Sequence, residues 1–292
     1  MVNEIVIEMK NIKYVYPDGH VALKNVNLRI FKGERVGILG ANGAGKSTLL
    51  MLTNGLFKPT EGQIHVFGMS MDKNNLHRIR MKVGLVFQDP DDQLFSPTVL
   101  DDVAFGPLNM GLPKDEALQR AREAIKIVGL EGYEDRPPHH LSIGEKKKVA
   151  IATILAMNPE ILILDEPTVN LDPKSKVEMI KFINKLYHEQ KITLIVTTHD
   201  IDMIPMIVDR VYILNKGEII AEGSVREVFA NFEIMEKANL EPPIIARLFY
   251  LIYKIYGCED SNLTKYLPLT IEEALEKIKY LINIKDASVM GF

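Results

Sequence analysis

The sequence predicts an α/β fold whose core is a largely parallel sheet. Three apolar runs carry this prediction, and each is followed at once by glycine, acidic or histidine residues: Arg35–Leu39, Glu160–Leu164 and Thr193–Thr198. Continuous apolar runs of this length are typical of strands buried on both faces of a parallel sheet. Helix-like segments follow the first and the third run, which favours the same fold class.

The length and composition leave room for one large domain with an appendage, or for two domains. The chain has 292 residues, near the size where a single hydrophobic core stops growing. Hydrophobic residues make up 47% and charged residues 25%, an ordinary composition that excludes disorder, collagen-like repeats and a disulfide scaffold. The formal net charge of −4 gives no indication of a nucleic-acid partner. The single cysteine, Cys258, cannot form an internal disulfide, which indicates a reducing compartment.

The N-terminus predicts a strand, because residues 1–8 alternate apolar and polar instead of running basic and then apolar as a signal peptide does. The most apolar window, Ile244–Tyr256, contains Arg247 and Lys254 and is shorter than the roughly twenty residues of a membrane span. We therefore expect a protein that stays inside the cell and has no transmembrane segment.

A glycine-rich loop follows the first apolar run. Residues 40–47 read Gly-Ala-Asn-Gly-Ala-Gly-Lys-Ser, and a helix-like segment begins at Thr48. Glycines let the backbone fold into a nest of N–H groups, and the helix N-terminus behind it adds partial positive charge. Lys46 supplies a charge for the β- and γ-phosphates, and the hydroxyl of Ser47 is placed for Mg²⁺. The pattern predicts phosphate binding, and the alternative is a glycine-rich turn without a ligand.

Polar side chains follow three apolar runs. Asp165 and Glu166 follow the second run, where Asp165 suits the Mg²⁺ shell and Glu166 can act as general base on a water in line with the γ-phosphate. His199 follows the third run and is expected to contact the γ-phosphate. Gln88 ends a further run that starts at residue 83, and it is a candidate contact for Mg²⁺ or its water. The alternatives are acids that cap a strand, a structural histidine and a glutamine without a ligand.

A capping box begins a long helical pattern at residue 142. In this motif the Ser142 hydroxyl accepts from the amide of Glu145 and the Glu145 carboxylate reaches back, which makes a strong helix start that favours anions. The alternative is a capped helix without a ligand, whose face at Lys146–Lys148 is solvated.

Taken together, these segments resemble the ATP-binding cassette (ABC) ATPases from about Val6 to Ser224. The resemblance implies a P-loop NTPase core with an N-terminal antiparallel β-subdomain, a helical signature subdomain and a C-terminal, mainly helical extension. The cofactors it implies are ATP and Mg²⁺. The matching motifs are Walker A at Gly40–Ser47, the Q-loop at Gln88, the signature motif at Leu141–Glu145, Walker B at Asp165 and Glu166, the D-loop at Asp172 and the switch histidine at His199.

The resemblance also implies a role for each residue. The implied catalytic residues are Glu166, His199, Lys46 and Gln88. The implied ATP-binding residues are Gly40, Asn42, Gly43, Ala44, Gly45, Lys46, Ser47, Thr48 and Tyr16. The implied Mg²⁺-binding residues are Ser47, Gln88 and, through water, Asp165. Tyr16 is expected to stack on adenine, with Tyr14 as the less favoured candidate, and either tyrosine can instead be a strand residue packed on the sheet. ATP is expected to join two subunits head to tail, with Ser142, Gly144 and Glu145 facing the γ-phosphate of the opposite subunit.

Residues 87–98 and 102–107 resemble the ATPase subunits of energy-coupling-factor importers, and within these the cobalt/nickel branch. In that family two ATPases drive a membrane scaffold protein, which moves a membrane substrate-binding protein. The resemblance implies import of cobalt, nickel or a vitamin from the cytoplasmic face of the cell membrane, by a homodimer or a heterodimer of ATPases and without nucleic acid. Leu94 and Phe95 either line a groove for a partner helix or tuck into the helical subdomain.

The alternative function is a soluble ABC ATPase that is not coupled to transport and acts on nucleic acid or in translation. A DNA-acting ABC protein carries a long coiled coil between its Walker motifs, and no sustained heptads occur there in this chain. A translation-associated ABC protein usually fuses two cassettes, whereas this chain has one Walker A loop. Transport is therefore the favoured function.

Some residues depart from the family pattern. The signature motif has Ile143 and Glu145 where Gly and Gln are more usual, and the charge of Glu145 is expected to weaken dimer closure. Asn170 stands where a small residue is usual and can adopt the left-handed conformation of a glycine. Residues 215–218 read Asn-Lys-Gly-Glu, which a turn explains without guanine specificity. The seven histidines and the cysteine have no ligand spacing, so we expect no cobalt or nickel site.

The predicted organisation is a nucleotide-binding domain over residues 1–223, with a helical subdomain at about 90–160, and an extension over residues 224–292. Pro113 is expected to open a helix with one apolar face, and residues 211–220 to form a hairpin. In the extension, Thr270 and Glu273 predict a capping box. An apolar stripe follows it, made of Ile271, Ala274, Leu275, Ile278, Leu281 and Ile282. The extension either dimerises, as the resemblance implies, or packs on its own cassette.

Overall fold

The computed structural model describes residues 4–255 and 267–279 of the chain. The expectations for Cys258, Leu281 and Ile282, and for residues 1–3 of the N-terminal strand, lie outside the described residues.

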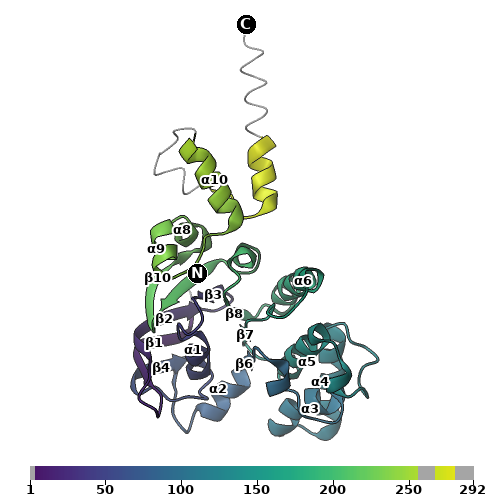
Figure 1. Ribbon diagram of the computed structural model, residues 1–292. Coiled ribbons are helices and arrows are strands. Elements are labelled where there is room, and N and C mark those ends of the chain that lie inside the picture. Colours follow the sequence, from purple (N-terminus) through teal and green to yellow (C-terminus); the bar gives the residue numbers. More distant parts are fainter. Residues whose placement is uncertain (1–3, 256–266, 280–292) are drawn as a thin grey trace.

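A six-stranded sheet forms the centre of the molecule, in the order β10-β9-β3-β8-β7-β6 (Figure 1). Five of these strands are parallel, and β10 returns antiparallel to β9. Every residue of β7 and β8 is buried, which is why their sequences read as continuous apolar runs. The bounds are β3 (Arg35–Leu39), β6 (Val83–Val86), β7 (Ile161–Asp165), β8 (Thr193–Thr198), β9 (Arg210–Asn215) and β10 (Glu218–Ser224).

These strands confirm the predicted parallel core. The bounds of β3 and β8 are those predicted, and β7 lies one residue later in the chain than expected. The hairpin of β9 and β10 also forms, with Lys216 and Gly217 both in the left-handed region at its turn.

The N-terminal part of the chain forms a second, antiparallel sheet in the order β2-β1-β4-β5. Its strands are β1 (Ile5–Val15), β2 (Val21–Phe31), β4 (Glu61–Val66) and β5 (Met69–Ser70). Its apolar residues share one core with β3 and with α1 (Lys46–Thr53), in which Val26, Ile38 and Leu49 are fully or almost fully buried. The predicted antiparallel subdomain is thus present, and it supports the chain on both sides of the glycine-rich loop.

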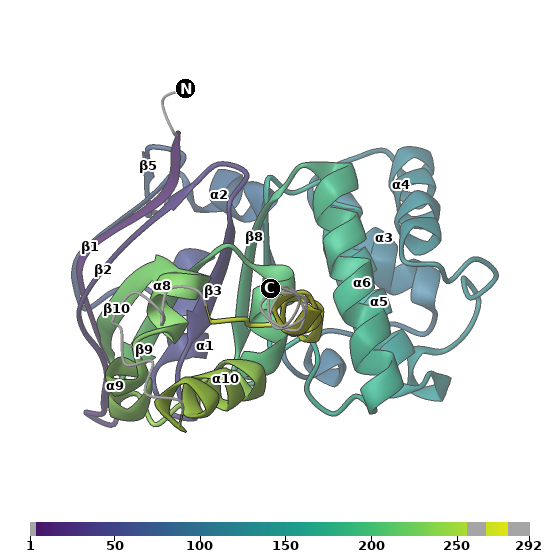
Figure 2. The same ribbon diagram turned by 90° about the horizontal axis from the view of Figure 1, so that it is seen from above.

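A group of three helices lies on the side of the central sheet away from β1 and β2: α3 (Val99–Asn109), α4 (Lys114–Ile127) and α5 (Ile143–Leu155) (Figure 2). Pro113 is the N-cap of α4, as predicted, and the helix buries Ala117, Ala121 and Ala124 against its neighbours. The remaining cassette helices are α2 (Leu76–Lys82), α6 (Pro173–Gln190) and α7 (Ile204–Ile207).

The extension begins with α8 (Val225–Phe229), α9 (Phe232–Lys237) and α10 (Ile244–Ile255), and a further helix covers residues 271–279. Its helices gather above the central sheet, on the opposite side from α2 (Figure 1). One polar contact joins the extension to the cassette, and another joins two of its own helices. Asp202 Oδ1 accepts from the amide of Ile244 at 2.8 Å, and Arg226 pairs with Glu273 at 2.7 Å.

The capping box predicted at Thr270 forms in part. The Thr270 hydroxyl accepts from the amide of Glu273 at 3.2 Å, but the Glu273 carboxylate accepts from the amide of Leu269, one residue earlier than the motif requires. Arg226 donates to the other carboxylate oxygen of Glu273, and this bond explains why the Glu273 side chain reaches Leu269 instead of Thr270. Among the described members of the apolar stripe, Ala274 is buried and the larger side chains are exposed: Ile271, Leu275 and Ile278.

Candidate active site

The parallel register brings four chain segments to one edge of the central sheet. β3 and β8 pair as far as Leu39 and Thr198, β7 pairs with β8 as far as Asp165, and β6 pairs with β7 as far as Val86. The residues that follow these strand ends therefore emerge as neighbours: Gly40, Phe87, Glu166 and His199.

The glycine-rich loop, residues 40–47, needs glycine for two different reasons. Gly43 and Gly45 have φ values of 78° and 107°, in the left-handed region that side chains disfavour. A Cβ at Gly40 would lie 2.3 Å from the carbonyl oxygen of Leu214, so no side chain fits there. The loop opens directly onto α1, whose first residue is Lys46. Its ammonium folds back and donates to the carbonyl of Gly40 at 2.7 Å.

A cavity of about 320 Å³ lies over this loop. It brings together the loop, the N-terminal subdomain and the ends of β6 and β7, and the lining is Tyr16, His20, Ala22, Asn42, Gly43, Ala44, Gly45, Lys46, Ser47, Thr48, Gln88 and Glu166. Most of the predicted site residues therefore share one cavity. His20 and Ala22 are additions that the sequence analysis missed. No motif marks these two residues, and they reach the cavity only because β2 begins beside the loop.

The structure separates the two candidate tyrosines. Tyr16 lines the cavity, and its hydroxyl lies 2.8 Å from Oγ1 of Thr48. Tyr14 instead stacks on Phe57, with ring centroids 5.1 Å apart, and meets the edge of Tyr16. Burial raises the pKa of the Tyr14 hydroxyl. Of the two tyrosines, Tyr16 therefore faces the cavity, and Tyr14 packs against it.

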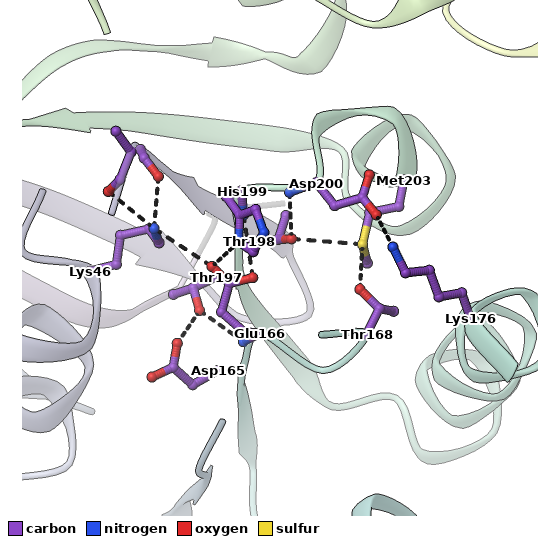
Figure 3. Close-up of polar contacts among 12 residues, drawn as sticks. Lys46, Asp165, Glu166, Thr168, Lys176, Thr197, Thr198, His199, Asp200 and Met203 are labelled. Carbon is purple, nitrogen blue, oxygen red and sulfur yellow. Dashed lines mark hydrogen bonds and ion pairs between the residues drawn. The ribbon is translucent and has the colours of Figure 1, made fainter. Parts of the chain in front are cut away.

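Glu166 occupies the centre of a polar network at the sheet edge (Figure 3). Its side chain is almost fully buried and its backbone is left-handed, with a φ of 47°. Nδ1 of His199 lies 3.0 Å from Glu166 Oε1, and Nζ of Lys46 lies 3.6 Å from that same oxygen. A left-handed glutamate is a strained conformation that persists only where its surroundings hold it, and such residues cluster at active sites.

The groups predicted to hold Mg²⁺ are all oxygen donors, the ligand type that this ion prefers. Ser47 and Gln88 line the cavity. Asp165 lies at the end of β7, outside that lining, and one of its oxygens accepts from the hydroxyl of Thr197. The chemistry of these three side chains would suit a magnesium ion. Within the described residues, no three His, Cys, Asp or Glu side chains form a metal-ligand group.

The signature residues lie outside the cavity. Ser142 is the N-cap of α5, and the predicted capping box with Glu145 is present. Hydrogen bonds from the side chain and the amide of Ser142, and from the hydroxyl of Tyr133, hold the pKa of Glu145 below its ordinary value. Among the described residues, a Cβ at Gly144 would meet only Leu171, at an ordinary 3.7 Å, so no described neighbour requires a glycine there.

The lysines after the signature motif do not form the solvated face that a simple capped helix predicts. Lys147 is 4% exposed, and its Nζ lies 3.1 Å from the carbonyl oxygens of both Gln88 and Glu166. Burial lowers the pKa of this lysine, and Asp89 together with Glu166 opposes the shift. The alternative of a solvated face is therefore wrong for Lys147, because two loops distant in sequence fold over its side chain.

The D-loop residues also lie away from the cavity lining. Asp172 is the N-cap of α6, where its Oδ1 accepts from the amides of Lys174 and Ser175, and the Ser175 hydroxyl lowers the pKa of its carboxyl group. Asn170 has a φ of 62°, which confirms that it adopts the left-handed conformation of a glycine.

The two side chains that were candidates for a partner groove differ in exposure. Leu94 is buried in the core, whereas Phe95 is 67% exposed and packs edge-on against Phe105.

A glycine-rich phosphate loop at a helix N-terminus, beside buried acids at the end of a parallel strand, defines the protein as a P-loop nucleotide triphosphatase. Comparison with known families narrows this class, because residues 23–169 match the model of the ABC transporter family. The chain belongs to the ABC transporter family, and it is an ATPase of that family.

Relatives of known name agree with this assignment. The energy-coupling factor transporter ATP-binding protein EcfA of Methanocaldococcus jannaschii is 49% identical over 85% of this chain and 90% of its own length. The EcfA of Methanococcus maripaludis is 47% identical over 95% of this chain and 99% of its own length. The chain is thus similar to energy-coupling-factor ATP-binding subunits over nearly its whole length.

Solved structures share the fold. CbiO1 of Clostridium perfringens, part of the ABC transporter complex CbiONQ, is 43% identical, with a TM-score of 0.72 over 85% of this chain and 99% of that chain. A dimeric bacterial ABC transporter cassette is 37% identical, with a TM-score of 0.67 over 75% of this chain and 99% of that chain. Among the residues that the structure describes, no helix is both long and apolar enough to cross a bilayer.

Proposed function

We propose that this chain is the ATP-hydrolysing subunit of an energy-coupling-factor importer, and that it works on the cytoplasmic face of the cell membrane. The cargo we propose is cobalt, nickel or a vitamin, selected by a membrane protein and not by this chain. The observation that carries the enzymatic part is the convergence of Lys46 and His199 on one buried oxygen of Glu166. Similarity to EcfA proteins and to CbiO1 supports the importer part.

In the proposed reaction, Glu166 orients and deprotonates the attacking water, because its buried carboxylate lines the cavity over the phosphate loop. Lys46 and His199 offset the charge that develops on the transferred phosphoryl group. When bound, Mg²⁺ neutralises charge on the β- and γ-phosphates. Ser47 and Gln88 orient that end of the nucleotide, and Tyr16 stacks on the adenine.

We further propose that a second subunit completes the site. Ser142 and Gly144 are at the exposed start of α5 and do not line the cavity of their own chain. No neighbour within the described parts of the chain requires a glycine at position 144, which supports a contact with another molecule. The partner is a second copy or a different ATPase, which faces the γ-phosphate with its own signature motif. The dimeric cassette of similar fold supports this arrangement.

The proposed contact with the membrane scaffold protein is the exposed apolar patch of Phe95, Phe105 and Leu108. Phe95 and Phe105 lie edge to face with ring centroids 4.9 Å apart, and all three side chains are substantially exposed. A patch of this kind suits insertion against an apolar helix of a partner. Leu94 takes no part, since it is buried.

The proposed role of the extension is to hold two ATPases together. Exposed apolar side chains on α10 and on helix 271–279 support this role: Leu248, Leu251, Ile255, Ile271, Leu275 and Ile278. Asp202 fastens the extension to its own cassette, and the pair of Arg226 with Glu273 joins α8 to helix 271–279 within the extension.

A pull-down from native membranes tests the proposal. The bait is the full-length Glu166→Gln variant with ATP, and mass spectrometry identifies what is recovered. We expect to recover a polytopic scaffold protein and a small membrane protein. Recovery of no other ATPase would indicate a homodimer, and recovery of one further ATPase would indicate a heterodimer. Recovery of soluble or nucleic-acid-associated partners alone would overturn the importer and favour a soluble ABC ATPase.

A further inference from the structure

We propose that Lys147 is a positioning residue for ATP hydrolysis, which holds the main chain of Glu166 and of the Q-loop in one fixed relation to α5. Lys147 lies on the second turn of α5, and its ammonium reaches two segments that both contribute to the ATP cavity. Nζ donates to the carbonyl of Gln88 and to the carbonyl of Glu166, each at 3.1 Å. The proposal rests on the ATPase activity and not on import.

The burial of this lysine is unusual for its position. Lys146 and Lys148 on either side of it are partly exposed, and a lysine is rarely buried unless it is paired. The ammonium of Lys147 donates to two carbonyl oxygens, and the negative charges of Asp89, Glu166 and Asp165 favour its charged form. An uncharged apolar side chain of similar length would fill the space but would leave the Gln88 carbonyl without this donor.

α5 and the Q-loop segment, residues 87–93, are joined by other bonds as well. Lys146 pairs with Asp91 at 2.7 Å. Gln93 donates to the carbonyl of Ala150 at 2.8 Å, and its own amide oxygen accepts from the amide of Phe87 at 3.1 Å. These contacts make α5 and the Q-loop segment one unit.

Lys147 extends this unit to the base. Of the hydrogen bonds made by residues 4–255 and 267–279, the one from Lys147 is the bond that links α5 to Glu166. The same carbonyl also accepts from the amide of Val169, at 3.2 Å. Because the backbone of Glu166 is left-handed, its surroundings must hold it in place, and Lys147 is part of those surroundings.

The consequence is a mechanical link between the Q-loop segment and the proposed base. A shift of the Q-loop segment or of α5 against the sheet moves the Lys147 ammonium, which changes the position of the Glu166 main chain. The carboxylate of Glu166 then changes its distance from His199 and Lys46. A small displacement of a catalytic group costs orders of magnitude in rate without loss of substrate binding.

The test compares Lys147→Met, which keeps the length of the side chain and removes its donors, with Lys147→Arg, which keeps charge and donors. Lys148→Met, at the partly exposed lysine that follows Lys147 in α5, is the matched control. For purified full-length protein, we measure kcat and KM for ATP, and the affinity for ATP in a Glu166→Gln background. Lys147→Met is expected to lower kcat at least about tenfold with KM and affinity within about twofold, since charged hydrogen bonds of this kind correspond to at least one order of magnitude in rate.

Rescue separates positioning from a merely structural role. Lys147→Arg is expected to keep kcat within about threefold of the parent, and Lys148→Met to match the parent in every measurement. A structural role would lower the melting temperature and raise KM in both Lys147 variants while leaving kcat per folded molecule unchanged, and that result would overturn the proposal. If Lys147→Met does not fold, Lys147→Gln takes its place in the test. Its side chain is shorter and uncharged, so the proposal requires a lower kcat at unchanged affinity for ATP. A kcat equal to that of the parent would refute the proposal.

Discussion

His199 and Glu166 share a hydrogen bond across the ends of two neighbouring parallel strands, with 3.0 Å between Nδ1 and Oε1. The bond exists because β7 and β8 pair in register as far as Asp165 and Thr197, so the residues that follow leave the sheet side by side. The amide of His199 also donates to the other carboxylate oxygen of Glu166, at 3.3 Å. Both oxygens of the proposed base are therefore oriented before any ligand arrives.

Replacing this carboxylate tests the base directly. Glu166→Gln is expected to lower the steady-state rate of ATP hydrolysis by about two to four orders of magnitude, the range of a general base, while ATP binding is retained. Phosphate release and nucleotide binding are measured on the same preparation. Glu178→Gln, at an exposed glutamate on α6, is the matched control. An unchanged turnover rate in Glu166→Gln would remove Glu166 from the mechanism.

Alanine substitutions of the two tyrosines in the N-terminal subdomain are expected to have different effects on ATP affinity and on thermal stability. Tyr16→Ala removes the ring that lines the cavity and is expected to weaken ATP binding about tenfold, which corresponds to loss of one stacking contact. Tyr14→Ala removes the ring stacked on Phe57 and is expected to lower the melting temperature more than the affinity. Binding titrations and thermal melts on both variants make the comparison. The reverse pattern would assign the adenine to Tyr14.

Acid is expected to weaken the start of α5. Hydrogen bonds from Ser142 and Tyr133 favour the charged form of Glu145, so its pKa in the folded chain lies below the ordinary 4.5. The stabilisation is therefore complete above about pH 4.5 and is lost as the pH falls through the lower, folded value. Glu145→Gln does not titrate, so the difference in melting temperature between parent and variant should narrow below pH 4.5.

Glu131→Gln, at an exposed glutamate near the same helix, controls for simple loss of a surface charge. A gap between parent and Glu145→Gln that stays constant from pH 7 to pH 4 would show that the capping carboxylate contributes no pH-dependent stability.

A side chain at Gly84 is expected to push α5 away from the sheet. A Cβ at this buried position in β6 would lie 2.0 Å from Cγ2 of Ile154 on α5. Gly84→Ala should lower the free energy of unfolding by about 1–3 kcal/mol, as overpacking does. The double variant Gly84→Ala with Ile154→Ala should regain part of that loss, because it removes the clashing atom. Simple additivity of the two losses in urea unfolding would contradict this account.

The apolar patch of Phe95, Phe105 and Leu108 gives a prediction that concerns partners alone. Phe95→Ser should leave the ATPase rate of the isolated chain unchanged, because Phe95 does not line the ATP cavity. The same variant should recover much less of the membrane scaffold protein in the pull-down. The matched control is Val177→Ser, at an exposed valine on α6. Phe232→Ser would be unsuitable, because the ring of Phe232 stacks on Tyr250. Equal recovery with Phe95→Ser would place the docking surface elsewhere.

Much of the site was predictable from the sequence because its residues follow buried strands. An apolar run that ends at Asp165 and another that ends before His199 fix where the chain leaves the sheet, and parallel pairing does the rest. The capping box of Ser142 is equally local, since its partners are three residues apart. These features depend on short-range patterns, which a single sequence contains.

Other features depend on the tertiary structure. Three consecutive lysines at residues 146–148 favour a solvated helix face, and only the packing of the Q-loop and of the Walker B turn over α5 buries Lys147. Leu94 and Phe95 have no periodicity that would separate the buried from the exposed side chain. Tyr14 and Tyr16 diverge because β1 ends at Val15, so the alternation of a strand no longer relates them.

The position of Ser142 and Gly144 outside their own cavity has a kinetic meaning. In the proposed arrangement, a complete site exists only after two chains meet, so the rate per molecule depends on how often they meet. At high dilution, specific activity would rise in proportion to protein concentration, and it would level off once most chains are paired. The molecule would thus hydrolyse little ATP while it is dispersed. Gathering two ATPases, of the same or of different sequence, on one membrane complex would itself start ATP hydrolysis.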